Sequence, residues 1–418
     1  MKPCFFPADI LLPDFTRTDG RRWSVVACDQ FTSEPEYWAQ AVAEVGDAPS
    51  TLRLTLPEVW LGEAETRIPA INAAMHDALR DVLVCHPGKM LFLDRTQSDG
   101  THRLGIIGAV DLEAYDYTRG AQTPIRATEG TVLERIPPRV AIRRDAPLEL
   151  PHVMLLIDDP ARTVIEPVAA RASELEQAYD FDLMLGGGHV CGRWLDEAAV
   201  AGINAALAGL STPETMEAKY GAAVEPLLFA VGDGNHSLAS AKATYEEIKA
   251  KLGDAALEHP SRYALCEVVN LHDEGLGFEP IYRVVFGVEP EALLDELEAY
   301  AAGLGGNVEG QQVEAIWASG SRTVALPHAV QQLTVGTLQA FLDGYLRAHP
   351  GAEVDYIHGE GSLRALAAQP GAIGFLFDGM EKGQLFKTVL FDGALPRKTF
   401  SMGHAEDKRY YLEARKIK

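Results

Sequence analysis

Apolar and polar positions follow two different periods along this chain. Short apolar runs, which are typical of buried strands, alternate irregularly with segments in which apolar residues recur at helical spacing. The runs that we predict to be strands are residues 23–28, 90–93, 103–110, 153–157, 227–231 and 372–377, and a Ser-Asp-Gly turn at 98–100 joins two of them as a hairpin. This alternation indicates α/β or α+β architecture.

The predicted helices carry recognisable end signals. Ser33 is placed to cap a helix that begins at Pro35, since proline suits the first helical turn. After the strand at 227–231, apolar residues recur at helical spacing up to Leu252, and Gly253 stands where a glycine C-cap belongs. The other predicted helices are residues 68–84, 164–179, 196–207, 291–304 and 335–349.

The length of 418 residues is enough for two or three domains. We find no internal repeat and no low-complexity tract in the sequence. We expect a boundary near residue 287, so that residues 1–287 form an N-terminal and catalytic core region. Residues 288–418 then form a C-terminal α/β region.

The strongest candidate for a reaction centre is a Gly-Asp-Gly-Asn-His-Ser turn that starts at Gly232, between an apolar strand and an amphipathic helix. Gly232 and Gly234 permit backbone conformations that other residues avoid, and they let a ligand approach the main chain. The amides of Asn235, His236 and Ser237 then point out of the helix N-terminus. Unpaired N–H groups and the helix dipole favour an anion at that position.

Two side chains of this turn are suited to chemistry. Asp233 places a carboxylate beside the anion site, where it can hold a cation or accept a hydroxyl proton. His236 can donate to a phosphoryl oxygen or act as an acid/base. The alternative is a structural turn in which Asp233 or Asn235 caps the helix and His236 is satisfied locally.

The second feature is a cluster of six arginines within residues 119–144, namely Arg119, Arg126, Arg135, Arg139, Arg143 and Arg144. A helix can start at Pro138, which puts Arg139 and Arg143 four residues apart on one face. Two guanidiniums on one face form a clamp for a phosphate or a carboxylate. The alternative is a solvated face whose charge is balanced by Glu129, Glu134 and Asp145.

The acidic composition narrows the classes of function. The chain has 37 Lys and Arg against 60 Asp and Glu, a net charge of −23. This balance argues against a general nucleic-acid binder, whereas a local basic pocket is enough for a small phosphate compound. The five cysteines form no Cys-x-x-Cys pair, and no apolar stretch approaches the length of a membrane span. We therefore expect a cytoplasmic protein without a membrane or nucleic-acid partner.

Three further segments are weaker candidates. Asp29 with Gln30 follows a predicted strand and can either sit at a ligand cleft or simply precede a helix. Lys398 can reach a phosphate or be solvated. Residues 186–189, Gly-Gly-Gly-His, lack the lysine and serine or threonine of a P-loop and are more typical of a loop or hairpin turn. The common motifs of zinc proteases, α/β-hydrolases, kinases and dinucleotide-binding dehydrogenases are absent from the sequence.

The turn at Gly232 resembles the Asp-Gly-His-His-Arg signature of a large bacterial family of uncharacterised proteins. That family is related to the free-serine kinases of the ParB/sulfiredoxin-like superfamily. Three other segments resemble motifs of the same family, in order, and extend the resemblance over most of the chain. They are Thr128-Glu129-Gly-Thr131, Glu279-Pro280-Ile281-Tyr282-Arg283 and Leu395-Pro396-Arg397-Lys398-Thr399-Phe400.

The resemblance implies an α+β fold with a ParB/sulfiredoxin-like mixed core and additional N- and C-terminal α/β elements. Members with an assigned activity phosphorylate free L-serine to O-phosphoserine with ADP, ATP or inorganic diphosphate. By position, Asp233, Gly234 and His236 would serve phosphate binding and acid/base work, and Glu129 would lie near the serine hydroxyl. The residues that would hold a phosphate or the serine carboxylate are Arg135, Arg139 and Arg143.

The chain departs from the family pattern at three positions, which puts donor binding in question. Asn235 replaces the first histidine, Ser237 replaces the arginine, and Tyr282 stands where histidine is common. These departures support a second hypothesis, a non-catalytic protein on a ParB-like scaffold that senses a nucleotide or phosphate or binds a partner. A ParB-like nuclease is disfavoured by the strong acidity.

Our leading hypothesis is a small-molecule phosphotransferase that phosphorylates the hydroxyl of free L-serine, with diphosphate, ADP or ATP as the donor. Positioning and charge neutralisation dominate this chemistry. The expected catalytic residues are Asp233, His236 and Glu129, and Mg²⁺ held by Asp233 is the expected cofactor. Substrate or phosphate binding is expected of Gly232, Gly234, Asn235, Ser237, Arg135, Arg139, Arg143 and Lys398. The oligomeric state stays open, a homo-oligomer included.

Overall fold

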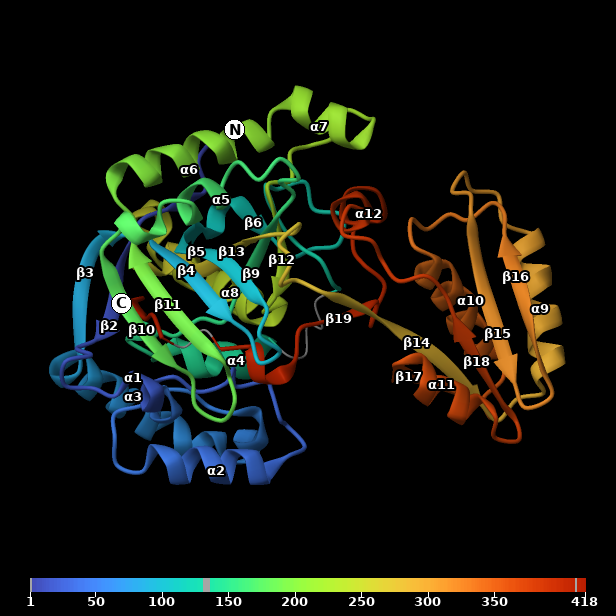
Figure 1. The fold of residues 1–418 in the computed structure, drawn as a ribbon, viewed down its shortest axis with the longest axis horizontal. Helices are drawn as coiled ribbons and strands as arrows, with labels where there is room; N and C mark the ends of the chain where they lie inside the picture. Colours follow the sequence, from blue (N-terminus) through green and yellow to red (C-terminus); the bar gives the residue numbers. More distant parts are fainter. Residues whose placement is uncertain (1, 131–135, 410–411) are drawn as a thin grey trace. The chain divides into compact units, whose positions relative to one another are not determined.

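The structure is a computed structural model that describes residues 2–130, 136–409 and 412–418 (Figure 1). It is a mixed α/β protein that divides into two compact units. Unit 1 consists of Met1–Leu276 and Gly403–Lys418, and unit 2 is Gly277–Met402. The first boundary therefore falls before the one expected at residue 287, and the end of the chain belongs to unit 1 instead of the C-terminal region.

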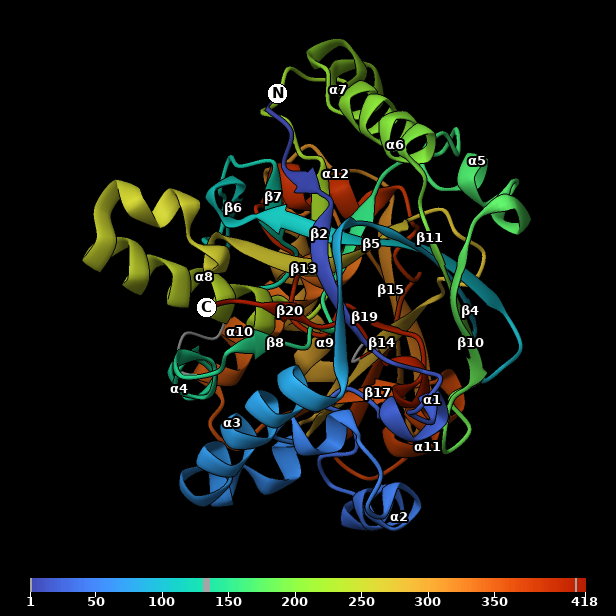
Figure 2. The ribbon, with the colours of Figure 1, turned by 90° about the vertical axis from the view of Figure 1, so that its left-hand side faces the viewer.

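The last residues belong to unit 1 because they pair with its N-terminal segments. Strand β20 (Arg415–Lys416) pairs with β8 (Leu148–Glu149), and Ala414 forms a bridge with Leu11 of β2 (Ala8–Pro13). Strand β2 in turn pairs with β3 (Leu83–Lys89), and Figure 2 shows these two blue strands.

Unit 1 is built on one mixed sheet, which has ten strands among the described residues. Along the sheet, the order is β10 (Gln177–Asp182), β11 (His189–Trp194), β4 (Leu91–Thr96), β5 (His102–Asp111), β13 (Tyr263–Asn270), β9 (Met154–Ile157), β12 (Phe229–Asp233), β7 (Ile125–Ala127) and β6 (Tyr115–Asp116), with β1 (Phe5–Phe6) on β5.

The strand directions place several chain segments at one edge of this sheet. Strand β12 runs parallel to β7 and antiparallel to β9. The carboxyl ends of β7 and β12 and the start of β9 therefore lie at the same edge. Loops at such an edge can bring residues that are distant in sequence to one site.

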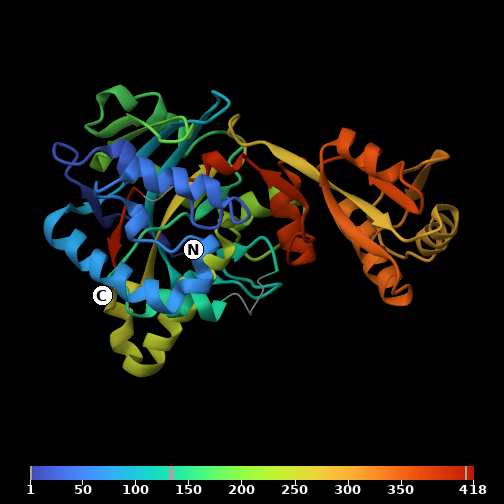
Figure 3. The same ribbon diagram turned by 90° about the horizontal axis from the view of Figure 1, so that it is seen from below.

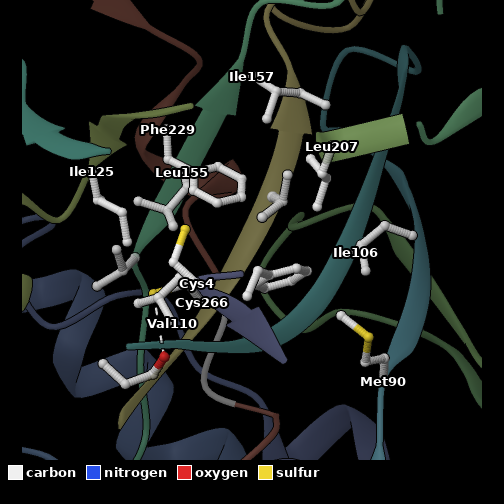
Figure 4. Packing of buried hydrophobic residues seen from close by; sticks show 14 of the residues in the cluster. Cys4, Met90, Ile106, Val110, Ile125, Leu155, Ile157, Leu207, Phe229 and Cys266 are labelled. Carbon is white, nitrogen blue, oxygen red and sulfur yellow. Dashed lines mark hydrogen bonds between the residues drawn. The ribbon is translucent and has the colours of Figure 1, made fainter. Parts of the chain in front are cut away.

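The main core lies against the central strands of this sheet. Phe229, Leu155 and Ile125 come from three neighbouring strands and are fully buried, and Leu207 joins them from α6 (Figure 4). The helices of unit 1 are α1 (Gly20–Trp23), α2 (Pro35–Val45), α3 (Ala64–Asp81), α4 (Ile136–Arg144), α5 (Glu166–Ala169), α6 (Glu197–Leu210), α7 (Pro213–Tyr220) and α8 (Asn235–Leu252).

A second core joins the N-terminal helices to the end of the chain. Ile71 and Met75 of α3 pack in it with Trp23, Ala414 and Ile417. Helices α2 and α3 are the longer blue helices of Figure 3. Burial of residues 414 and 417 among these helices is a further reason why the chain end belongs to unit 1.

Unit 2 has its own six-stranded sheet among the described residues. Its strands are, in order, β16 (Gly320–Leu326), β15 (Gln311–Trp317), β18 (Ala372–Leu376), β14 (Phe278–Phe286) and β17 (Glu353–His358), and β19 (Phe400–Met402) also pairs with β14. Its helices are α9 (Pro290–Ala302), α10 (Thr334–Ala348), α11 (Glu360–Ala367) and α12 (Gln384–Asp392). Within the described ranges, every helix of the chain is too short or too polar to cross a lipid bilayer.

Most of the predicted elements are confirmed, with ends that shift by a few residues. Strands are found at five of the six predicted positions, and the hairpin at residues 98–100 joins β4 to β5. Helix α8 ends at Leu252 with Gly253 as its C-cap, as expected. Helix α2 does begin at Pro35, but its N-cap is Glu34, so the predicted cap at Ser33 is wrong. Helix α4 starts at Ile136 and not at Pro138.

Two predicted elements are wrong because tertiary contacts override the local pattern. Residues 24–28 form no strand. The Trp23 carbonyl accepts from the hydroxyls of Ser50 and Thr51, and the Ala27 amide donates to the Lys408 carbonyl. These backbone groups therefore do not pair with a neighbouring strand. Residues 164–179 are not one helix, since only Glu166–Ala169 are α-helical and strand β10 begins at Gln177. The apolar residues of this segment are divided between two cores.

Candidate functional site

The turn after β12 requires glycine at its centre. Strand β12 ends at Asp233, helix α8 begins at Asn235, and Gly234 between them is the N-cap residue with φ of +79°. A Cβ at position 234 would lie 3.1 Å from the Cα of Val153 and 3.2 Å from the carbonyl oxygen of His152. The left-handed backbone and this close approach therefore both disfavour a side chain.

We expect Gly234→Ala to destabilise the protein by about 2 kcal/mol, because a left-handed alanine is strained and its Cβ presses on Val153. The matched control is Gly202→Ala in α6, where a Cβ meets nothing within 4 Å. That substitution is expected to stabilise by about 0.5–1 kcal/mol, since alanine favours the helix. Urea unfolding of both variants measures the difference, and equal stabilities would show that the turn tolerates a side chain.

Neither Asp233 nor Asn235 caps α8, so the simple capping alternative for this turn does not hold. The Asp233 Oδ1 accepts from the adjacent amide of Gly234 at 2.9 Å. The Asn235 side chain points to the next strand, where its Oδ1 accepts from the Thr128 amide at 3.2 Å and its Nδ2 donates to the Thr128 Oγ1 at 3.3 Å. As a glycine, the N-cap residue offers the first amides of the helix no side-chain acceptor.

The bonds between Asn235 and Thr128 bring two of the sequence motifs together. Thr128 follows β7, whose end lies beside the end of β12, and its hydroxyl also donates to the carbonyl oxygen of Val231 at 2.6 Å. Glu129, which is exposed, is the next residue. The Thr128–Glu129 segment therefore lies beside the N-terminus of α8.

A cluster of charged side chains borders the turn on its other side. The Lys408 Nζ lies 3.5 Å from the Asp233 Oδ2. The His152 Nε2, just before β9, lies 3.6 Å from the Asp29 Oδ2 and 3.5 Å from the Ser237 Oγ. We call Asp29, His152, Asp233 and Lys408 the charged quartet. Its members come from four segments that are far apart in the sequence.

The charges of the quartet shift the pKa values of two of its members. Burial alone would raise the pKa of Asp29, but the charge and hydrogen bond of His152 outweigh burial and lower it. Burial alone would lower the pKa of His152, but Asp29 and then Asp233 outweigh burial and raise it, against a smaller effect of Lys408. The pair thus favours an ionised carboxylate beside a protonated imidazole.

The contacts of His152 are not those of a Ser-His-Asp triad. In a triad, the serine and the aspartate contact opposite nitrogens of the imidazole, so that one nitrogen accepts while the other donates. Here Ser237 and Asp29 both face the Nε2. One nitrogen cannot donate to the carboxylate and accept the serine proton together, so this geometry does not favour Ser237 as a nucleophile.

The arginines of the predicted clamp are engaged with carboxylates. Arg139 pairs with Glu58, Arg143 with the buried Glu149, and Arg144 with Glu247 at 3.2 Å. Helix α4, which carries these arginines, packs on α8 through a small apolar cluster that includes Ile136, Val140 and Ala239. The helix is therefore next to the turn, but its guanidiniums neutralise neighbouring acids. Arg135, Glu134 and Thr131 lie outside the described residues.

Lys398 belongs to unit 2, whereas the turn belongs to unit 1. Its side chain is exposed, its φ is +52°, and its carbonyl accepts from the buried Arg283 at 2.9 Å. Arg283 also donates to the carbonyl of Arg397 at 2.8 Å. A buried guanidinium thus shapes the loop that carries Lys398.

The role of Asp233 as a Mg²⁺ ligand stays a prediction. Among the residues that the structure describes, no group of three His, Cys, Asp or Glu side chains is arranged to hold a metal ion. One carboxylate oxygen of Asp233 accepts from an amide, and the other faces the ammonium of Lys408. The Asp233 carboxylate thus has an amide donor on one oxygen and an ammonium beside the other.

Sequence reasoning missed two residues of the site, His152 and Lys408. A lone histidine before a strand carries no signal, and Lys408 stands in a charged run, Glu-Asp-Lys-Arg, that is typical of a solvated surface. Asp29 was the weak candidate after a predicted strand, and it lies in the site although that strand is absent. Only the fold brings these segments to the turn.

A family model identifies the family to which the chain belongs. A family model described as protein of unknown function, DUF1015, matches residues 14–416. The chain is therefore a member of the DUF1015 family. No curated protein matches the chain.

Several solved structures show weak likeness to the chain. A free serine kinase variant in complex with AMP has 9% identity over 74% of this chain and 91% of that one, with a TM-score of 0.37. SbnI with a C-terminal truncation from Staphylococcus aureus has 12% identity, coverages of 71% and 82%, and a TM-score of 0.34. A conserved hypothetical protein from Pyrococcus furiosus has 12% identity, coverages of 70% and 89%, and a TM-score of 0.33. TM-scores of this size are too low to transfer a fold or a function.

Proposed function

We propose that this protein is a small-molecule phosphotransferase that phosphorylates the hydroxyl of free L-serine. The observation that carries the proposal is the pair of hydrogen bonds between Asn235 and Thr128. They hold a carboxylate-bearing segment, Thr128–Glu129, beside a helix N-terminus whose cap is a glycine. Phosphoryl transfer needs an anion site and a positioned base in this proximity.

In the proposed reaction, the first amides of α8 hold the phosphoryl group that is transferred. The serine hydroxyl oxygen forms the new P–O bond while the bond from that phosphorus to the donor's bridging oxygen breaks. The hydroxyl proton passes to the Glu129 carboxylate, and the electron pair of the broken bond stays on the departing phosphate or nucleotide. In this proposal His236, in the first turn of α8, donates to a phosphoryl oxygen. Mg²⁺ bound to the donor's phosphates would neutralise part of their charge.

Asn235 has a physical role in this site. Its amide both accepts from and donates to Thr128, and a single neutral imidazole nitrogen cannot do both. The replacement of the family's first histidine therefore leaves the two motifs joined. The replacement of the family's arginine by Ser237 removes a positive charge from the same turn.

The proposal is tested by incubating the purified protein with Mg²⁺, L-serine and, separately, ATP, ADP or inorganic diphosphate. We expect O-phosphoserine by ³¹P NMR with at least one donor. Folded protein that yields no product with any of the three would overturn the proposal. Thermal stabilisation by a donor without product would instead support the second candidate, a phosphate- or nucleotide-sensing protein, which the missing charge at Ser237 favours.

With the productive donor, Glu129→Gln is expected to lower kcat about a hundredfold, because an amide cannot accept the hydroxyl proton. The matched control is Glu274→Gln, which changes a side chain that is 88% exposed and pairs only with the surface residue Arg162 among the described contacts. The control should keep the activity of the unmodified protein. Equal kcat values for the two variants would exclude Glu129 as the base.

A further inference from the structure

The charged quartet lies beside the N-terminus of α8, where Lys408 faces Asp233 and His152 faces Ser237. Asp233 and Asp29 contribute two negative charges, and Lys408 and a protonated His152 contribute two positive charges. Since these charges cancel, the positive end of the α8 dipole decides the sign of the field at the turn. A neutral group of side chains that includes two cations can accept an anion without leaving a carboxylate unpaired.

The main chain around Lys408 is held in place by buried contacts. The Arg95 guanidinium, fully buried, donates to the carbonyl of Arg409 at 3.0 Å and to that of Asp407 at 3.1 Å. The Lys408 carbonyl accepts from the amide of Ala27 at 2.7 Å. The position of the lysine beside the turn is thus determined by both ends of unit 1, whose N-terminal and C-terminal segments meet at this point.

The ammonium of Lys408 keeps donors for a ligand. Its distance of 3.5 Å from the Asp233 Oδ2 is longer than a strong charge-assisted hydrogen bond. An ammonium has three N–H donors, and one carboxylate oxygen at this distance does not use them all. The side chain is 25% exposed, so solvent reaches it. Lys408 can therefore bind an anion while it still faces Asp233.

The pairing of His152 with Asp29 affects how strongly Lys408 can bind an anionic ligand. Asp29 attracts Lys408 as well as His152. A protonated His152, whose side chain is 6% exposed, neutralises Asp29 from the protein side. Asp233 is then the main carboxylate facing Lys408. Without the imidazolium, two carboxylates would compete with a ligand for one ammonium.

We propose that Lys408 binds the transferable phosphate at this site and that the Asp29–His152 pair positions it, in the role that the sequence suggested for Arg139 and Arg143. This inference rests on the proposed function for the identity of the ligand as a phosphate. It assigns the binding cation to the segment 403–409, near the end of the chain. Arg139 and Arg143 instead neutralise Glu58 and Glu149.

The test is the affinity for inorganic diphosphate, measured by calorimetry in the presence of EDTA. Lys408→Met should weaken binding about tenfold, the worth of one charge-assisted hydrogen bond. Lys408→Arg, which keeps the charge, should retain most of the affinity. Arg144→Gln removes one positive charge from an exposed pair and is the matched control, and it should bind as the unmodified protein does. Thermal unfolding confirms that each variant is folded.

A second measurement separates positioning from a general structural effect. His152→Gln should weaken diphosphate binding because Asp29 then competes for Lys408. In the double variant, Asp29→Asn added to His152→Gln removes that competitor and should restore part of the affinity. A purely structural role for His152 predicts that the double variant binds no better than the single one.

The proposal is overturned if the unmodified protein does not bind diphosphate, if Lys408→Met binds as tightly as the unmodified protein, or if Arg144→Gln weakens binding equally. Binding through Lys408 without any O-phosphoserine would refute the proposed function and leave this inference intact. If O-phosphoserine forms but Lys408→Met binds diphosphate as tightly as the unmodified protein, the proposed function stands and this inference is refuted.

Discussion

Replacing Glu149 by alanine is expected to lower the free energy of unfolding by about 3–5 kcal/mol, because the change leaves buried guanidiniums without a carboxylate. The Glu149 Oε1 accepts from the Arg415 Nε at 2.8 Å and from the Leu265 amide at 3.0 Å, and its other oxygen pairs with Arg143. The side chains of Glu149 and Arg415 are 3% and 7% exposed. Both charges are therefore inside the protein.

The control for this substitution is Glu247→Ala, which removes the carboxylate of an exposed pair with Arg144. Those two side chains are 41% and 54% exposed, so the expected loss is under about 1 kcal/mol. Urea unfolding followed by tryptophan fluorescence compares the variants. Similar losses for both would mean that Glu149 does not need its partners, and Arg143 would again be a candidate for ligand binding.

This prediction bears on function because it concerns the predicted arginine clamp. If Arg143 left Glu149 for a phosphate, the buried carboxylate would lose one of its two guanidinium partners in a low-dielectric environment. The helical spacing of Arg139 and Arg143 was recognised correctly, but spacing does not show which charges lie opposite a helix face. That depends on residues 58 and 149, which the fold brings to it.

Replacing Glu413 by glutamine is expected to remove a pH dependence of stability worth about 3 kcal/mol. Burial raises the pKa of Glu413 and outweighs the hydrogen bond from Tyr179. With the smaller effects of Glu267, which raises the pKa, and Arg95, which lowers it, the pKa is about 7 instead of the ordinary 4.5. Glutamine keeps an oxygen that can accept from the Tyr179 hydroxyl, so this hydrogen bond survives the change.

The sign of the effect follows from where the proton is bound. Between pH 4.5 and about 7, the folded protein keeps the Glu413 proton and the unfolded chain releases it, so stability falls as the pH rises through this window. Above pH 7, both states are ionised and the loss is complete. The stability of Glu413→Gln relative to the unmodified protein should therefore increase from pH 5 to pH 8. Parallel pH profiles from urea unfolding would contradict the raised pKa.

The turn at residues 232–237 could be predicted from the sequence because its geometry is local. An apolar strand, two glycines and an amphipathic helix determine a strand–turn–helix, and the structure shows Gly234 in the left-handed conformation that this requires. The resemblance to the family also implied that Glu129 acts at the same site as the turn. The parallel pairing of β7 with β12 supports this and explains the contact between Thr128 and Asn235.

The other half of the candidate site could not be read from the sequence. Asp29, His152 and Lys408 lie in segments without periodicity, and each alone has the composition of an ordinary loop. Their charges matter only because both ends of unit 1 meet at the start of β9, where the Ala27 amide donates to the Lys408 carbonyl. The contact between residues 27 and 408 could not be predicted from the hydrophobic pattern, because that pattern describes periodicity only over about ten to twenty consecutive residues.

By itself, then, the sequence determined the mixed α/β class, most of the helices and strands, and the local turn, because periodicity, glycines and end signals act within one element. Only the tertiary structure decided which basic side chains neutralise buried carboxylates and which lie beside the turn. Burial and the distance between opposite charges set that division, and both depend on residues far apart in the chain. Arg143 and Lys408 illustrate the two outcomes: the first neutralises Glu149 in the interior, and the second faces the turn at Asp233.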